Sequence, residues 1–287
     1  MNCKRGIRRV SPARKGSNNN GLKDDLQAAA TNYVIEGDDA TIDSVNARVR
    51  RGNYTCISDK TAIITGTQEK VRKGGSVKSD MKYHMQKKMR ELKQDVEKMI
   101  FDNNARVSGN DTTAREAAGV PSWLITNVSK ASDGTLATGD GTDAYTTGTA
   151  RALTEALVEA PLALAWANGG MPTQAYLGQF QKRKFAAFTG NTTRTQEQKS
   201  SGKLMNTVDS YVDPLGNEIR LIPDRHSVTS MIFYMDPEYW KFVTLRDFFT
   251  QDLSITGDAL KKQILVEWTL EVGNEKASAM TVDLSTS

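Results

Sequence analysis

The feature that most constrains the fold is a long amphipathic segment over residues 79–103. Its apolar residues recur at spacings of three and four, which predicts one α-helix with a single apolar stripe. Ser79 can cap the start of this helix, and Asn103 can end it. At 1.5 Å per residue the helix is roughly 35 Å long, which is long for one of only a few helices in a modest domain. We expect the stripe to lie in the core. It consists of Met85, Met89, Leu92, Val96, Met99 and Ile100.

Residues 263–272 form the clearest strand of the sequence. The side chains alternate strictly, which is typical of a strand in a sheet with one buried face. One side presents Ile264, Val266, Trp268, Leu270 and Val272, and the other presents Leu265, Glu267, Thr269 and Glu271. Three shorter strand candidates precede it at residues 204–212, 218–223 and 231–235. After them, Asp236 and Pro237 predict the start of a helix that runs to about residue 245.

A two-stranded excursion is expected over residues 43–71. Short β-type runs lie within this segment, and Gly52-Asn53 and Gly66 interrupt them. An isolated two-stranded ribbon is only marginally stable in water, so something outside the ribbon must supply its packing. Basic residues flank the strands. They are Arg48, Arg50, Arg51, Lys60, Lys70, Arg72 and Lys73.

The other segments complete a chain of mixed helices and strands, of the α+β class. Residues 22–30 suggest a short helix, and residues 127–149 are rich in Gly, Ser, Thr and Asp and suggest an exposed loop. A second helix is expected over residues 149–168, kinked or split by Pro161. Residues 173–188 suggest a strand followed by a helix.

The N-terminal segment is strongly basic. Residues 1–23 contain seven Lys and Arg residues and no acidic residue, and their Ser, Asn and Gly content is too polar to bury. Such an arm is attracted to phosphate by charge alone; the alternative is a solvated terminus with no partner. The residues that could face DNA are Arg5, Arg8, Arg9, Arg14 and Lys15.

No motif in the sequence indicates catalysis. Neither His84 nor His226 belongs to a recognisable triad or zinc-binding segment. Cys3 and Cys56 form neither a disulfide framework nor a metal site, which fits synthesis in a reducing cytoplasm. No phosphate-binding loop is present. We therefore expect no catalytic residue, no metal ion and no cofactor.

An acidic turn, the lack of a long apolar run and the net charge give little support for a metal site, a membrane span or nucleic-acid binding. Asp38-Asp39, with Glu36 nearby, could ligate a hard cation, but adjacent carboxylates on a turn are usually solvated. No apolar run approaches the roughly 20 residues of a membrane span, so we expect no membrane association. The net charge of +4 is a mild excess that does not by itself indicate nucleic-acid binding.

Several segments in order resemble the major capsid proteins of short-tailed phages, which share the Hong Kong 97 capsid fold of tailed phages and herpesviruses. The resemblance covers residues 22–284. None of the segments is a catalytic signature, and their order and spacing together carry the resemblance. They are residues 36–41, 51–55 through 65–69, 87–97, 105–110 through 118–121, 188–191, 236–240 and 263–271.

The resemblance implies a division of the chain into five parts. A basic N-terminal arm covers residues 1–42, and an extended loop that lies across a neighbouring subunit covers residues 43–78. Residues 79–150 form a peripheral domain with the long helix as its spine. Residues 151–223 form an axial domain at the centre of each hexamer or pentamer, and residues 224–287 return to the peripheral domain.

The function implied by the resemblance is assembly of an icosahedral shell without enzymatic activity. Many weak, repeated contacts between copies of one chain sum into a closed particle. The implied partners are further copies of the chain, portal, scaffolding or cement proteins, and packaged double-stranded DNA held non-specifically. The implied location is the virion capsid, after synthesis in the bacterial cytoplasm.

Contacts between subunits are expected along the extended loop. We hypothesise that its basic residues pair with acidic residues of neighbours; the alternative is a solvated basic face. The expected contact residues are Arg48, Arg50, Arg51, Tyr54, Lys70, Arg72 and Lys73.

Two other functions remain open at this point. A basic nucleic-acid-binding protein would use the arm and the loop and would bind DNA tightly with steep salt dependence, but no helix with clustered base-reading side chains supports it. A hydrolase with a carboxylate pair would need a cleft that no motif marks.

Overall fold

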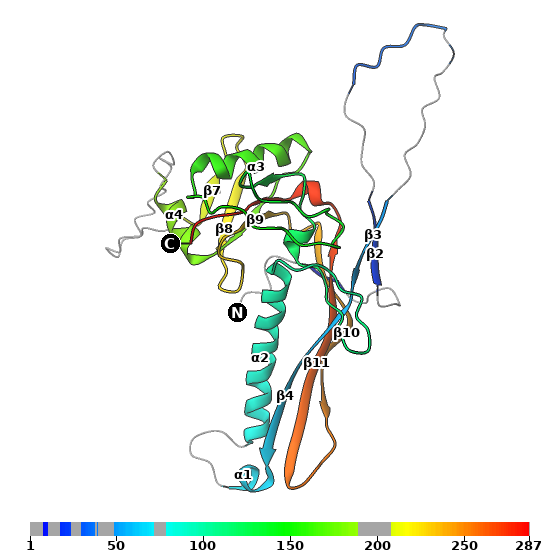
Figure 1. The fold of residues 1–287 in the computed structure, drawn as a ribbon, viewed down its shortest axis with the longest axis vertical. Helices are drawn as coiled ribbons and strands as arrows, with labels where there is room; N and C mark the ends of the chain where they lie inside the picture. Colours follow the sequence, from blue (N-terminus) through cyan, green and yellow to red (C-terminus); the bar gives the residue numbers. More distant parts are fainter. Residues whose placement is uncertain are drawn as a thin grey trace, which may run out of the picture.

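The computed structural model of the chain describes residues 8–10, 18–23, 30–37, 39, 49–71, 79–188 and 208–286. They form three parts (Figure 1). The stem consists of α2 (Asp80–Phe101) and a sheet in the order β1-β10-β11-β4. The head lies at one end of the stem and contains a second sheet, and the ribbon β2-β3 leaves the body beside the head.

The stem is built on α2, as the sequence predicts. The Ser79 hydroxyl accepts a hydrogen bond from the backbone N–H of Lys82 at 3.2 Å and caps the helix. The apolar stripe packs against the sheet: Leu92, Val96 and Ile100 are buried, and the three methionines of the stripe lie against the same core. The strands of this sheet are β1 (Arg8–Val10), β10 (Trp240–Asp252), β11 (Ala259–Val272) and β4 (Cys56–Thr65).

Trp268 is the main apolar side chain that β11 contributes to the stem. It is 1 % exposed, and its indole stacks on Phe242 of β10 with 5.5 Å between ring centroids. Its Nε1 donates a hydrogen bond to the Ser58 hydroxyl of β4 at 3.0 Å. One side chain thus joins three adjacent strands.

Both faces of β11 are buried at its centre, which corrects the expectation of one buried face. Glu267 and Thr269, on the side predicted to be solvated, are 4 % and 0 % exposed. Arg115, from the loop that follows α2, and Arg246 of β10 lie against Glu267. A loop that folds back over the strand therefore supplies a cover that the alternation of β11 does not reveal.

The head combines a six-stranded sheet with two helices. The sheet order is β5-β12-β9-β6-β8-β7. One face of this sheet, with Phe233 and Met280, shares the core of the stem, and the other face packs in a second core with the two helices. The strands are β5 (Val128–Ser129), β12 (Ala279–Thr281), β9 (Ile232–Met235), β6 (Gln174–Leu177), β8 (Glu218–Pro223) and β7 (Ser210–Val212), with the helices α3 (Glu155–Ala167) and α4 (Gln179–Ala186). The strand-then-helix expectation for residues 173–188 is confirmed by β6 and α4.

Pro161 lies inside α3 without dividing it. Proline lacks an N–H, so the carbonyl of Leu157, four residues earlier, loses its helical donor. The hydroxyl of Thr281 in β12 donates to that carbonyl at 3.1 Å. The sheet thereby satisfies the carbonyl that the proline leaves without a helical donor, and the predicted split does not occur.

The helix expected from Asp236 to about residue 245 is wrong, because β10 occupies most of that range. Asp236 and Pro237 instead form a turn in which the backbone N–H of Tyr239 donates to the carbonyl of Asp236 at 3.2 Å. From Trp240 onward the chain pairs with β11 over the length of the strand. Pairing with a long strand outweighs a local helix-start signal.

The pairing expected within residues 43–71 is also wrong. Strand β3 (Val49–Tyr54) pairs with β2 (Asn18–Lys23), and β4 pairs with β11 in the stem. Because residues 22 and 23 lie in β2, the short helix expected over 22–30 does not begin there; residues 24–29 lie outside the described residues. Alternation identified these strands but did not identify their partners.

The segment 127–149 is only partly exposed: Ser132, Asp133 and Thr138 are exposed as expected, whereas other residues of the segment are buried. Asn127 and Tyr145 are buried, and the Tyr145 hydroxyl donates to the carboxylate of Asp283. Asp283 also accepts hydrogen bonds from the backbone N–H groups of Ala131 at 3.0 Å and Gly148 at 2.8 Å.

In the described residues no helix is long and apolar enough to span a lipid bilayer.

We predict that Trp268→Ala destabilises the subunit by about 3–5 kcal/mol, because it leaves a cavity where three strands meet. Urea unfolding of the soluble subunit, followed by circular dichroism, measures the change. The control is Ile63→Ala on β4, whose side chain is 64 % exposed; its expected effect is within about 0.5 kcal/mol. Equal losses for the two variants would contradict this description of the core.

Candidate functional site

The segment between the two strands of the ribbon carries three strongly exposed apolar side chains. Tyr33, Val34 and Ile35 follow one another beyond the end of β2 and are 94 %, 72 % and 76 % exposed. They lie far from the stem and the head in Figure 1. Three consecutive apolar side chains in water are an unfavourable arrangement unless another surface covers them.

The base of the ribbon is fixed to the body by Asn53. This side chain is 2 % exposed and uses both ends of its amide. Its Nδ2 donates to the carbonyl of Leu270 at 3.1 Å, and its Oδ1 accepts from the backbone N–H of Ala118 at 2.9 Å. The hydroxyl of Thr269 donates to the carbonyl of Tyr54 at 2.9 Å. The ribbon is therefore anchored at one end and exposed at the other.

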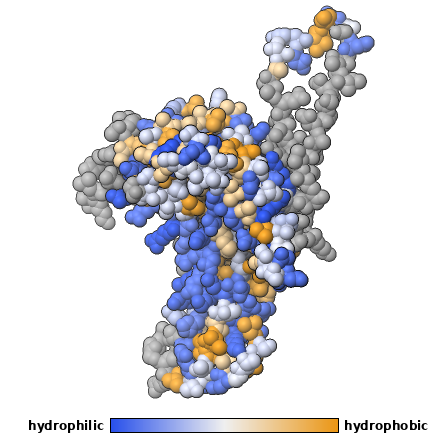
Figure 2. All heavy atoms as spheres, viewed as in Figure 1, coloured by the Kyte–Doolittle hydropathy of each residue, from blue (hydrophilic) through white to orange (hydrophobic). Residues whose placement is uncertain are grey.

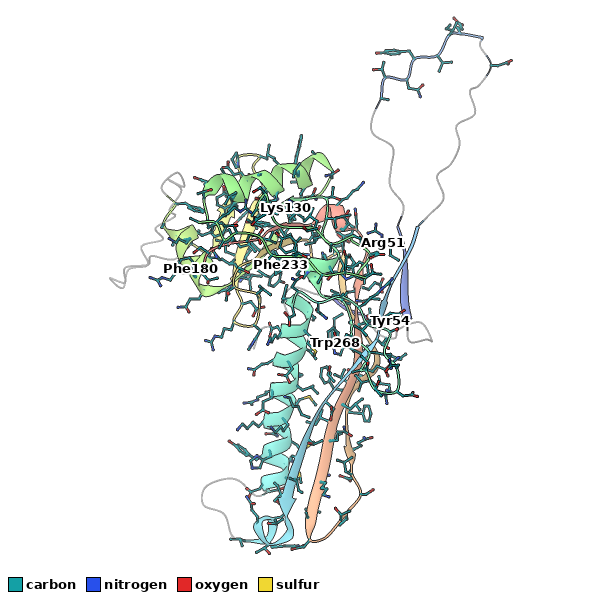
Figure 3. All side chains as sticks on the ribbon, in the orientation of Figure 1. Arg51, Tyr54, Lys130, Phe180, Phe233 and Trp268 are labelled. Carbon is teal, nitrogen blue, oxygen red and sulfur yellow. The ribbon has the colours of Figure 1, made fainter. Side chains whose placement is uncertain are left out.

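Two arginines strengthen this base. Arg106 donates to the carbonyl of Gly52, and its guanidinium lies 5.7 Å from the centroid of the Tyr54 ring. Arg51 donates to the carbonyl of Gly139. Figure 3 places Arg51 and Tyr54 where the ribbon meets the body.

Of the seven expected contact residues, the structure describes the side chains of Arg51, Tyr54 and Lys70, and these three do not share one surface. Arg51 and Tyr54 are half-buried and have partners in their own chain. Lys70 is exposed in the last turn of α1 (Gly66–Lys70), at the far end of the stem (Figure 1). Arg50 lies in β3, but its side chain is outside the described residues, as are the whole of Arg48, Arg72 and Lys73.

The expected DNA-facing arm is in part a component of the stem. Arg8 and Arg9 lie in β1, which pairs in parallel with β10 opposite Lys241 and Phe242. Arg5, Arg14 and Lys15 lie outside the described residues.

Glu267 forms a charged cluster that the sequence reading missed. Its carboxylate accepts from Arg115 Nη2 at 2.8 Å, from Arg246 Nε at 2.8 Å and from the Thr55 hydroxyl at 3.0 Å. Thr55 directly follows the ribbon, so the cluster joins the ribbon base, β10 and the loop after α2. The available signal was a charged residue between apolar neighbours on both sides, Val266 and Trp268.

The electrostatics of this cluster favour the ionised carboxylate. Burial by itself raises the pKa of Glu267, but the hydrogen bonds from Arg246 and Thr55 and the charges of Arg246 and Arg115 outweigh burial. The pKa therefore lies below its ordinary value.

The described residues contain neither a metal site nor an activated cysteine. No group of three His, Cys, Asp or Glu side chains there could hold a metal ion. Burial raises the pKa of the Cys56 thiol to about 12, so Cys56 is a protonated core residue and not a nucleophile. Of the acidic segment, Glu36 and Asp39 are exposed and Asp38 lies outside the described residues.

A family model described as SU10 major capsid protein matches residues 9–285. This span is nearly the whole chain. No curated protein sequence gives a significant match.

Solved structures of phage capsids share the fold. A chain of the cyanophage A-1(L) capsid asymmetric unit superposes with a TM-score of 0.68 at 10 % identity, covering 95 % of this chain and 90 % of that chain. A chain of Phage G, in a structure of gp27 major capsid proteins and gp26 decoration proteins, has a TM-score of 0.55 at 13 % identity and covers 96 % of this chain and 88 % of that chain. A chain of Gordonia phage Cozz has a TM-score of 0.58 at 11 % identity, with coverage of 98 % of this chain and 85 % of that chain. At these identities the likeness establishes the fold alone, and it confirms the Hong Kong 97-like capsid fold expected from the sequence.

We predict that Glu267→Gln lowers the free energy of unfolding by about 1–3 kcal/mol at pH 7, because two arginines lose a buried partner. The stabilisation from a depressed pKa is present above the ordinary pKa and is lost as pH falls through the folded one. The wild-type subunit should thus lose stability as pH falls below the ordinary carboxyl pKa of 4.5 and through the lower pKa of the folded state, and the variant should lose less.

Denaturant unfolding at a series of pH values measures both effects. The matched control is Glu271→Gln on the same strand, whose carboxylate is more exposed and lies 3.8 Å from Lys241 Nζ. This control should stay within about 0.5 kcal/mol of wild type. An unchanged pH profile in Glu267→Gln would contradict the role of the cluster.

Proposed function

We propose that this chain, which belongs to the SU10 major capsid protein family and is a phage capsid subunit, assembles as hexamers and pentamers into a closed icosahedral shell around double-stranded DNA. Its family and its structural neighbours are structural proteins of capsids. We propose no catalytic step, cofactor or metal ion for it.

The observation that carries the proposal is the ribbon, with its anchored base and exposed apolar end. Asn53, Arg106 and Thr269 hold the base against the body, whereas Tyr33, Val34 and Ile35 extend into water. An isolated two-stranded ribbon does not stabilise itself. A second copy of the chain can cover the exposed end, and each subunit of a ring would then both give and receive such a contact.

We assign the stem to the peripheral domain and the head to the axial domain. The head sheet draws β9 and β12 from residues 224–287. The axial domain that we propose is for this reason wider than residues 151–223. The extended loop likewise shifts toward the N-terminus, to the ribbon β2-β3 and the residues between its strands, because β4 pairs within the stem.

Further partners follow from the proposed shell. A closed shell needs a portal for its DNA, and scaffolding or cement proteins can act at its surfaces. The structure of Phage G contains decoration proteins beside its capsid proteins. The chain would be made in the cytoplasm of the host before it enters the virion.

We predict that Val34→Asp reduces particle yield strongly without changing the stability of the soluble subunit. The side chain is 72 % exposed in the single chain, so a charge costs little there, but burial of that charge in a contact between copies is unfavourable. Sedimentation velocity and electron microscopy measure assembly, and urea unfolding measures stability. Asn32→Asp adds the same charge at the exposed polar position two residues earlier and should assemble normally. Normal particle yield from Val34→Asp would contradict the role of the ribbon end.

We also predict that Lys70→Glu lowers particle yield, because a basic residue at the end of the stem would lose an acidic partner on a neighbour. Lys70→Gln, which removes the charge without reversing it, should have a smaller effect. Unchanged yield in both variants would leave Lys70 as part of a solvated basic face.

A further inference from the structure

The loop between β8 and β9 connects the head with the stem. Figure 1 shows this loop below the head, beside the end of α2. Ile222, near the end of β8, and Val228 of the loop pack against the core of the stem. The backbone N–H of Asp224 donates to the carbonyl of Leu177 in β6 at 2.9 Å. The loop, residues 224–231, is therefore fixed to the head sheet and packs on the long helix of the stem.

Two polar atoms of this loop are buried and have no hydrogen-bond partner among the described residues. They are Asp224 Oδ2 and Ser227 Oγ. The other carboxylate oxygen of Asp224, Oδ1, accepts from the backbone N–H of His226 at 2.9 Å. A buried acceptor without a donor is unfavourable, because it loses its hydrogen bonds to water and gains none in return. The carboxylate of Asp224 therefore lacks one donor.

Glu97 of α2 faces the same loop. Its side chain is half-buried, and within the described residues it forms neither a hydrogen bond nor an ion pair. The charges of the described residues that act on it are those of Asp224 and His226. Burial first and the like charge of Asp224 second raise the pKa of Glu97, and a positive charge on His226 acts in the opposite direction. A carboxyl group of the stem helix thus meets a carboxylate of the head loop.

Among the described residues, the other elements that pack on α2 bring no cation to this contact. Lys60 of β4 is paired with Asp95, at 2.6 Å between Nζ and Oδ2. The lysines of β11 lie opposite the last residues of β4, at the other end of the stem. The short helix η1 (Val120–Ser122) has no charged residue. Lys93, one turn earlier on α2, lies over the ring of Phe248, 5.6 Å from its centroid.

A proton on Glu97 would supply the donor that Asp224 lacks. A protonated carboxyl group has an O–H that donates, whereas an ionised one only accepts. Two neighbouring carboxyl groups can therefore share one proton, but they repel each other when both are ionised. Figure 2 shows a mostly hydrophilic surface along the stem below the head, so solvent can exchange protons with a half-buried group there.

We propose that Glu97 and Asp224 form a proton-operated latch between α2 and the loop 224–231, in which the O–H of Glu97 donates to Asp224 Oδ2 and holds the loop on the helix. Loss of that proton to solvent leaves two carboxylates in contact and releases the loop. Because the pKa of Glu97 is raised, the stabilisation is fully present below the ordinary pKa of 4.5 and is lost as pH rises through the folded one. The latch thus has the opposite pH dependence to the Glu267 cluster. It belongs to the single chain and does not require assembly, so its tests are independent of the proposed function.

The first experiment follows urea unfolding of the full-length soluble subunit from about pH 4 to about pH 8. Glu97→Gln keeps a donor for Asp224 and cannot ionise. Its urea midpoint should equal that of wild type at the acidic end and exceed it increasingly as pH rises. The matched control is Glu91→Gln on the same helix, whose carboxylate lies 2.8 Å from Lys88 Nζ and has a lowered pKa. The control midpoint should not exceed that of wild type at any pH. A Glu97→Gln midpoint that does not rise above wild type would overturn the proposal.

The second experiment locates the effect in the loop. Hydrogen exchange of the same subunit is measured at an acidic and a neutral pH and corrected for the intrinsic exchange rate, for the amides of residues 224–231 and, as a reference, for those of α3. We expect wild type to lose protection in the loop but not in α3 as pH rises, and Glu97→Gln and Asp224→Asn to keep it at both pH values. The double variant Glu97→Gln/Asp224→Asn should add little to either single variant, because the two residues act as one pair. Loop protection in wild type that does not change with pH, or gains that add fully in the double variant, would refute the latch.

Discussion

The structure depends on the burial of β11 on both of its faces. On one face, Trp268 and its apolar neighbours pack with α2 and form the core of the stem. On the other, Glu267 binds Arg115, Arg246 and Thr55, and Thr269 donates to the backbone of Tyr54 at the ribbon base. The carbonyl of Leu270 receives the amide of Asn53. The spine helix, the ribbon and the loop after α2 therefore all take their positions from one strand.

This arrangement connects stability with assembly. Burial of the apolar face of β11 stabilises the stem at any pH, whereas the Glu267 cluster on the other face contributes only while its carboxylate is ionised. The cluster adjoins the point where the ribbon leaves the body. Loss of the charge on Glu267 at low pH would therefore weaken its contacts with Thr55, Arg115 and Arg246, whereas the apolar core of the stem does not need that charge.

The sequence predicted the helix and the strand in which apolar residues recur regularly over many positions. The long helix α2 has six apolar positions in register and was predicted with nearly correct ends. Strand β11 was predicted from nine alternating residues with its correct end at Val272, but it begins at Ala259, four residues earlier than expected. The resemblance to phage capsid proteins supplied the fold class, which no local pattern gives. Strand partners were not predictable in the same way: alternation in β3 and β4 fixes which side chains share a face, but not which strand lies beside them. The helix predicted from Asp236 and Pro237 was wrong because the pairing of β10 with β11 is a tertiary interaction that a local helix-start signal does not reveal. The bonds from Arg115 to Glu267 and from Thr281 to Leu157 join residues more than 100 positions apart, and only the folded chain brings them together.

The central claim is that the chain functions as copies of itself in a closed shell. Electron microscopy of the purified full-length protein, alone and together with the products of neighbouring genes, tests it most directly, with sedimentation velocity of the same samples. The account predicts closed shells, tubes or stable hexamers and pentamers, in which the segment that contains Tyr33, Val34 and Ile35 is covered by a neighbouring copy. A protein that remains monomeric under every assembly condition, with those side chains still exposed, would contradict it.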